Sequence, residues 1–266
     1  MKTDCLRRGY VDWSRGELKS RAKDTLRTSY WKGFLVSLLL AVVSGSLPSC
    51  NWRSNHGATG GGSGGSSSFT WNMDGFPDVF NGFGAVIVGI LLVVIVIAVL
   101  AGIALEIFVL SPLKAGSYHY FKRASQEDVD MGYVGYGFKK GNYLGIVAGM
   151  FWRGWLNFWW FVLFIIPGIV KSYSYAMVPY ILTDNPGIGR KRAIQLSREM
   201  MHGQKWRTFV LDLSFIGWFL LGAIALGVGV LFVLPYYNST RAELYLALRQ
   251  MALDEGLSSQ EELCIL

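Results

Sequence analysis

Charged residues are scarce in this sequence. Asp, Glu, Lys and Arg make up 16% of its 266 residues, whereas soluble domains carry about 25%. Hydrophobic residues make up 52%, and they gather in a few long runs. This distribution is typical of a polytopic membrane protein rather than of a soluble domain.

Cysteine and histidine are also rare. The three cysteines, Cys5, Cys50 and Cys264, lie far apart and lack C-x-x-C spacing, so neither a disulfide framework nor a zinc site is expected. The three histidines are scattered, and the sequence holds no P-loop, dinucleotide, H-E-x-x-H or nucleophile-elbow pattern. We therefore expect no catalytic residue, no metal, no cofactor and no enzymatic activity.

Six apolar segments are predicted to cross the membrane as helices. The longest, residues 83–110, holds one charge in 28 positions and can span a hydrocarbon core of ~30 Å. The six spans are residues 33–47, 83–110, 143–166, 169–183, 206–221 and 223–237. The fold class is therefore predicted to be all-α, with one polytopic membrane domain over residues 1–266 and the lipid bilayer as its first partner.

The Lys and Arg counts predict the orientation of these spans. Nine basic residues precede the first span, five lie in residues 111–142 and six lie between Arg190 and Arg207, against one in residues 48–82. Because basic segments stay in the cytoplasm, both termini and the two basic loops are expected on the cytoplasmic side of the bacterial cytoplasmic membrane. This topology also explains the net charge of +7, so no nucleic-acid partner is expected. Residues 48–82, which contain ATGGGSGGSSS, are expected to form a flexible outer loop.

Three cytoplasmic segments are predicted to contain amphipathic helices. They are residues 14–31 within the N-terminal segment 1–32, residues 186–202 within segment 184–205, and residues 239–252 within the tail 238–266. The first opens with a capping box of Ser14 and Glu17. Its apolar stripe of Leu18, Ala22, Leu26 and Tyr30 lies either on the membrane surface or on the inner loops of the protein itself. In the second, Asn185 is expected to cap the helix and Gly203 to adopt the left-handed conformation past its end.

Four ionisable residues fall inside the predicted spans: Glu106, Arg153, Lys171 and Asp212. A charge in a membrane is costly, about 2.5–3.5 kcal/mol on insertion scales, so each is a candidate functional residue with a partner to be found. They could form an ion path or an anion-binding cavity around Arg153. The alternative is a structural network that neutralises itself and holds the spans together.

Small residues suggest close helix packing. Gly141, Gly145 and Gly149 form a G-x-x-x-G-x-x-x-G pattern, which lets another helix approach closely, either from the same chain or from a second copy. The oligomeric state stays open. Pro167 and Gly168 are expected to end the third span and to form the turn of a tight hairpin, sunk below the outer surface.

Several long strings carry a family resemblance. They are YGFKKGNYLGIV, IIPGIVKSYSYAMVPYIL, NPGIGRKRAIQLSREMMHGQKWRTFVLDLSFIGWFLLG and GVLFVLPYYNSTRAELY. In order and spacing they resemble the bacterial integral membrane family catalogued as domain of unknown function 975 (DUF975), over nearly the whole chain. A weaker likeness links the chain to the membrane domain of some glycerophosphodiester phosphodiesterases, but no hydrolase module accompanies it. The resemblance implies a six-span membrane protein and supplies neither an activity nor catalytic residues.

Two functions follow as hypotheses. The first is a non-enzymatic membrane scaffold or accessory factor for envelope proteins, peptides or lipids, because the amphipathic helices exceed what topology requires. Other membrane proteins or peptides would then be its partners. The alternative is a small transporter or channel in which the four buried charges line a path.

Overall fold

The computed structural model describes residues 13–44, 83–126, 128–224 and 229–263. Every regular element in these ranges is a helix, which confirms the all-α class. The predicted outer loop 48–82 and the three cysteines lie outside the described residues. The chain divides into two units, one of residues 1–48 with 106–266 and one of residues 49–105.

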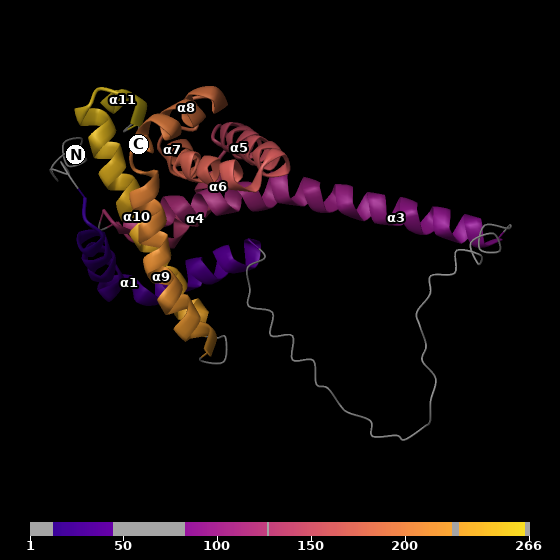
Figure 1. The fold of residues 1–266 in the computed structure, drawn as a ribbon, viewed down its shortest axis with the longest axis horizontal. Helices are drawn as coiled ribbons and strands as arrows, with labels where there is room; N and C mark the ends of the chain where they lie inside the picture. The colour runs from indigo at the N-terminus through magenta and orange to yellow at the C-terminus, as the bar shows by residue number, and fades with distance from the viewer. Residues whose placement is uncertain (1–12, 45–82, 127, 225–228, 264–266) are drawn as a thin grey trace, which may run out of the picture. The chain divides into compact units, whose positions relative to one another are not determined.

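The described part of the smaller unit is helix α3 (Phe83–Leu105), drawn in magenta in Figure 1. It contains no charged residue, and its aliphatic side chains from Val86 to Leu105 are exposed except for the half-buried Val88. A helix that is apolar on every side is suited to lipid rather than to water. It forms most of the predicted second span.

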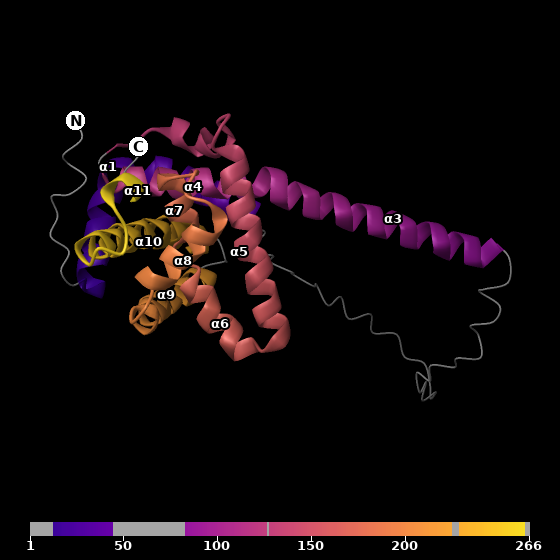
Figure 2. The same cartoon turned by 90° about the horizontal axis from the view of Figure 1, so that it is seen from above.

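The larger unit contains the remaining helices. They are α1 (Arg15–Val43), η3 (Glu106–Leu110, a π-helix), α4 (Ser111–Ala124), η4 (Met131–Phe138, a 3₁₀-helix), α5 (Tyr143–Leu163), α6 (Ile165–Ser174), α7 (Val178–Asp184), α8 (Arg190–Met200), α9 (Lys205–Ile224), α10 (Gly229–Asp254) and α11 (Gln260–Leu263). Figures 1 and 2 show α10 running between α1 and α9, and contacts with both of these helices hold it there.

Helix α1 joins the predicted amphipathic helix and the predicted first span. The Ser14 hydroxyl accepts a hydrogen bond from the Glu17 amide at 3.2 Å, as in the expected capping arrangement. The helix kinks at Ser29, whose φ is −138°. There the Ser29 and Thr28 hydroxyls both donate to the Thr25 carbonyl, and such competition with the backbone ladder bends helices.

The apolar stripe of α1 faces the protein. Leu18, Ala22 and Leu26 are buried and Tyr30 is half-buried, because α1 packs along α10 and α4. Of the two environments that the sequence allowed for this stripe, the structure has the packed one. The stripe is therefore not available as a membrane-facing surface.

Helix α10 corrects the expected tail. It continues without a break from the predicted sixth span into residues 239–252, and this second half is almost wholly buried. Leu244, Tyr245, Ala247 and Leu248 are part of the core, because α10 is covered by α1, α9, α4 and α8. The predicted interfacial helix 239–252 is therefore a core helix.

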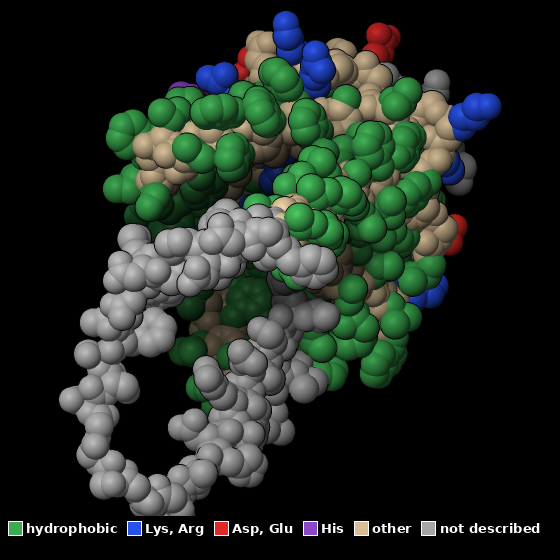
Figure 3. All heavy atoms as spheres, turned by 90° about the vertical axis from the view of Figure 1, so that its right-hand side faces the viewer, with side chains coloured by type: hydrophobic (Ala, Val, Ile, Leu, Met, Phe, Trp, Pro, Cys, Tyr) green, Lys and Arg blue, Asp and Glu red, His purple; other side chains and the backbone are tan. Residues whose placement is uncertain are grey.

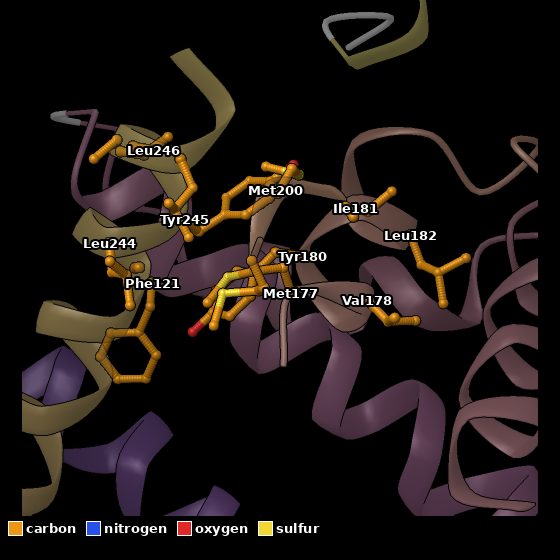
Figure 4. Close-up of a cluster of buried hydrophobic side chains, with 14 of the residues drawn as sticks. Phe121, Met177, Val178, Tyr180, Ile181, Leu182, Met200, Leu244, Tyr245 and Leu246 are labelled. Atoms are coloured by element: carbon orange, nitrogen blue, oxygen red, sulfur yellow. The ribbon is translucent and has the colours of Figure 1, made fainter. Parts of the chain in front are cut away.

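Helix α7 provides the other half of this core. All seven of its residues are buried, and the Tyr180 ring stacks on the Tyr245 ring of α10 with centroids 5.1 Å apart. Figure 4 shows Met177 and Tyr180 beside the side chains of α10, with Ile181, Leu182 and Val178 on the side away from them. Buried apolar area of this kind contributes about 25 cal/mol per Å².

The hairpin between the third and fourth spans differs from its prediction. The chain reverses at Phe164, which is extended with φ −156° and ψ 130°, and Figure 2 shows α5 and α6 as the two arms of the hairpin. Pro167 lies in the first turn of α6, where its missing N–H is harmless. Gly168 is needed because an added Cβ would lie 2.9 Å from the Phe161 ring.

The predicted fourth span, residues 169–183, is not one helix. It is divided into α6 and α7 by a turn at residues 175–177. The turn consists of Tyr175, Ala176 and Met177, and neither half alone is long enough to cross a bilayer. This break positions the candidate site.

Three described helices are long and apolar enough to cross a membrane: Arg15–Val43, Val86–Ala124 and Lys205–Ile224. They correspond to the predicted first, second and fifth spans, and they are consistent with membrane association. Hydrophobic side chains cover most of the described surface in Figure 3, with Lys and Arg toward its upper and right-hand margins.

Candidate functional site

A polar cavity of about 340 Å³ lies where α6 gives way to α7. Helices α4, α5, α6, α7, α9 and α10 of the larger unit contribute to its wall. Its principal side chains are Tyr118 of α4, Arg153 of α5, Tyr173 of α6, Tyr180 of α7, Asp212 of α9 and Arg241 of α10. Ala176, in the turn between α6 and α7, also lines it, which ties the cavity to the break in the predicted fourth span.

Asp212 is held by two donors. Its Oδ2 atom accepts a hydrogen bond from the Tyr173 hydroxyl at 2.9 Å and from Arg241 Nη2 at 2.7 Å. The Arg241 Nε atom donates to the Tyr237 hydroxyl at 3.0 Å. The carboxylate therefore neutralises Arg241 and fixes its orientation, and α6, α9 and α10 are joined through polar side chains.

Arg153 has no such partner. It is half-buried in the cavity wall, and among the described residues no side chain or carbonyl forms a hydrogen bond or an ion pair with it. The cavity thus holds two guanidinium groups and one carboxylate. Because the carboxylate is engaged by Arg241, the excess positive charge lies on Arg153.

The structure divides the four predicted intramembrane charges. Arg153 and Asp212 line the same cavity. Glu106 instead pairs with Lys114 at 2.6 Å, and the Lys171 ammonium lies 4.7 Å from the centre of the Trp160 ring. Neither Glu106 nor Lys171 lines the cavity, so the four do not form one network.

Arg241 was not among the sequence candidates. It follows the predicted sixth span by four residues and was assigned to a cytoplasmic tail. The signal that points to it is its spacing from Tyr237, because residues four apart share a helix face and α10 is continuous through both. A tyrosine and an arginine on one helix face, at the end of an apolar run, indicate that this face lines a polar site.

The small residues of α5 allow close packing inside the chain. A Cβ at Gly145 would lie 2.1 Å from the Pro186 carbonyl oxygen, and one at Gly149 would lie 2.4 Å from Leu182 Cδ1. Gly141 precedes α5 and has a φ of +110°. The helix packs against α7 and the turn after it, and this places Arg153, one turn further along α5, at the cavity.

A second polar cluster is almost completely buried and adjoins the cavity, because its Tyr245 ring stacks on the ring of Tyr180. The Lys122 ammonium donates to the Asp184 carboxylate and to Thr183 Oγ1, the latter at 3.2 Å. The Tyr245 hydroxyl also donates to Asp184, and Arg249 Nη1 lies 3.5 Å from it. These side chains connect α4, α7 and α10. Within the described part of the chain, no group of His, Cys, Asp and Glu could hold a metal ion.

Comparison with known proteins gives a family and no close relative. The model of the family described as "Protein of unknown function (DUF975)" matches residues 78–252, well over half of the chain. The matched range includes α3 and every residue that lines the cavity. Neither the curated proteins nor the solved structures contain a match.

Proposed function

The chain belongs to the DUF975 family, whose description names no activity, and we propose from the cavity that this membrane protein binds a small anion beside Arg153. The proposal concerns binding without a chemical reaction. It is closer to the transporter hypothesis than to the scaffold hypothesis. The charged residues assigned to the site are Arg153, Asp212 and Arg241.

The observation that carries the proposal is the absence of an acidic partner for Arg153 among the described residues. A half-buried charge is costly unless it is paired and hydrogen-bonded. A guanidinium presents five N–H donors in a planar fork that fits the two oxygens of a carboxylate or a phosphate group. A bound anion would supply the missing partner.

The size of the cavity agrees with such a ligand. Ligand sites occupy roughly 300–1,000 Å³, and 340 Å³ lies at the lower end of that range. At about 30 Å³ for each water-sized group, it holds roughly ten such groups. The tyrosines in its wall offer hydroxyl donors and ring faces that suit a small organic anion.

The burial of two amphipathic helices favours this proposal over the scaffold hypothesis. A scaffold that works through amphipathic helices needs their apolar faces free. The apolar faces of α1 and of the second half of α10 are buried within the protein, so they cannot dock a partner without unfolding the core. The cavity is the better supported site.

The six-pass topology is part of the proposal. Helices α1, α3 and α9 cover three passes, and exposed apolar side chains support the others. On α5 and α6 these include Phe158, Trp159, Ile165 and Ile166, which suit lipid contact. Both termini would lie in the cytoplasm of a bacterial cell, as the basic segments indicate.

Calorimetric titration of the protein in phosphatidylcholine nanodiscs tests the proposal. Acetate and inorganic phosphate are the probes. We expect at least one of them to bind, and Arg153→Gln to weaken it by tenfold or more. Lys171→Gln, which removes a charge outside the cavity, should leave the affinity within about twofold. No binding of either anion, or equal losses in both variants of unchanged fold, would contradict the proposal.

A further inference from the structure

We infer that the anion bound beside Arg153 is the headgroup of an amphiphile, whose hydrocarbon chain leaves the cavity over the apolar surface of α6 and α9. This inference rests on the proposed anion site and names the class of its ligand. A phosphodiester lipid, a fatty acid and a soluble anion all offer a single negative charge to such a site. We propose that the bound anion is part of a lipid.

The wall of the cavity leads directly to exposed aliphatic side chains. The hydrogen bond between Tyr173 and Asp212 joins α6 to α9 at this wall. Ile169 precedes Tyr173 by four residues and is 44% exposed, and Ile216 follows Asp212 by four residues and is 55% exposed. Residues four apart lie on the same helix face. Each of the two helices therefore carries an exposed aliphatic side chain one turn from the polar wall.

These two isoleucines are part of a larger apolar surface. Val170 on α6 and Leu213 on α9 are also exposed. In a protein with several helices suited to a bilayer, such a surface faces hydrocarbon. A lipid whose headgroup lies in the cavity needs apolar side chains next to it, on which its acyl chain can lie. A soluble anion would need no such flank.

The volume and charge of the cavity fit a lipid headgroup, but the volume is too small to hold the acyl chain as well. About 340 Å³ holds roughly ten water-sized groups, which is enough for a phosphodiester with a short polar substituent. A long acyl chain does not fit there as well. The excess charge is one positive unit, Arg153 and Arg241 against Asp212, which matches a singly charged headgroup and leaves the chain outside on apolar side chains.

Photo-crosslinking in nanodiscs tests the inference. The probe is phosphatidylglycerol with a diazirine on its acyl chain, diluted into phosphatidylcholine, and the control probe carries the same chain on phosphatidylcholine. We expect the phosphatidylglycerol probe to label the peptides that contain Ile169 and Ile216. This labelling should fall at least fivefold in Arg153→Gln and stay unchanged in Lys171→Gln.

Other results separate the inference from the proposed function. Labelling of the same peptides that is equal for both probes, or independent of Arg153, would identify ordinary lipid contacts and overturn the inference. If acetate or inorganic phosphate binds with Arg153 dependence and phosphatidylglycerol does not compete with it, the inference fails and the proposed function stands. If no anion binds, both fail.

A second variant keeps the test decisive if Arg153→Gln does not fold. Ile216→Gln replaces an exposed side chain one turn from the cavity wall and leaves all cavity residues in place. We expect it to reduce labelling of the α9 peptide while the affinity for a soluble anion stays within about twofold. Unchanged labelling would overturn the assigned path of the chain.

Discussion

Arg241 of α10 and Asp212 of α9 form a salt bridge of 2.7 Å at the wall of the cavity. Because Tyr173 donates to the same carboxylate oxygen, the acidic group is engaged and Arg153 is left with the excess charge. A site of this kind separates two tasks. One arginine holds helices together, and the other stays available for a ligand.

Asp212→Asn is predicted to strengthen anion binding and to weaken the fold. Among the described residues of the cavity, the substitution removes the one carboxylate and leaves two uncompensated arginines. We expect roughly tenfold tighter binding of the anion, equivalent to about 1.4 kcal/mol, and a loss of about 1–3 kcal/mol in the free energy of unfolding. Calorimetry and thermal denaturation in detergent measure the two effects.

Tyr173→Phe is the matched control for this variant. It removes one donor to Asp212 and retains the charges. Binding of the anion should therefore change little, and stability should fall by about 0.5–1.5 kcal/mol. If Asp212→Asn and Tyr173→Phe change anion affinity equally, then the charge balance of the cavity is not what sets the affinity.

The effect of a Gly→Ala substitution in α5 on stability is predicted to depend on which atoms the added Cβ would contact. Gly145→Ala should cost about 1–3 kcal/mol of overpacking, because the Pro186 carbonyl lies 2.1 Å from the added Cβ. Gly149→Ala should cost less, since the nearest atom is the end of the Leu182 side chain. Gly154→Ala meets nothing within 4 Å and should stabilise by about 0.5–1 kcal/mol.

Thermal denaturation of the three variants in one detergent gives the ranking. A dimer face predicts a different result: Gly145→Ala would then change the oligomeric mass, measured by light scattering, and leave the stability of the monomer unchanged. That outcome would contradict the intramolecular packing described here.

The packing of α11 is predicted to depend on pH. Arg192 of α8 donates to both Glu262 carboxylate oxygens, at 2.7 and 3.0 Å, and these hydrogen bonds lower the pKa of Glu262. A carboxyl whose pKa is lowered by folding stabilises the folded state above its unfolded pKa, about 4.3 for Glu. This contribution is lost as the pH falls through the lower folded value.

Hydrogen exchange of residues 255–263, corrected for the intrinsic rate at each pH, measures this loss. Exchange should rise only as the pH falls below about 4. In Arg192→Gln the hydrogen bonds are absent, so exchange should already be raised at neutral pH and vary less with acid. Lys191→Gln changes an exposed neighbour and should behave as the unmodified protein. A common profile for all three would exclude the ion pair as the cause.

Sequence patterns predicted two charged residues of the cavity and misplaced the start of a helix. Arg153 and Asp212 were found because an ionisable residue in an apolar run needs a partner, and Gly203 was expected in the left-handed region, where its φ is +74°. The helix after Asn185 was expected to start at Pro186. It starts at Arg190, because the Asn185 side chain accepts a hydrogen bond from Gly187 and forms a turn there instead.

Other features required the tertiary structure. The amphipathic pattern of residues 239–252 predicts an interfacial helix, yet Glu243 and Arg249 are buried. The sequence of residues 239–252 does not indicate that α1 and α9 pack on both sides of α10. The break at residues 175–177 was also missed, because tyrosine and methionine continue an apolar pattern whether or not the helix does.

The buried Lys122 is predicted to be essential for the fold. It connects α4 to Asp184 of α7, and both side chains are almost completely buried. Removing one partner of a buried pair costs up to about 3–5 kcal/mol, although Arg249, 3.5 Å from Asp184, still compensates part of its charge. Lys122→Met should therefore unfold at a much lower temperature, whereas Lys140→Met, at an exposed position, should stay within about 0.5 kcal/mol.

A double-mutant cycle identifies the partner. If Lys122 and Asp184 stabilise each other, Lys122→Met combined with Asp184→Asn should cost less than the sum of the single losses, by about 0.5–3 kcal/mol. Arg249 and Tyr245 also contact Asp184, so Asp184→Asn alone should cost more than Lys122→Met. Additive losses, or a Lys122→Met variant as stable as the unmodified protein, would show that packing rather than this charge pair holds α4, α7 and α10 together.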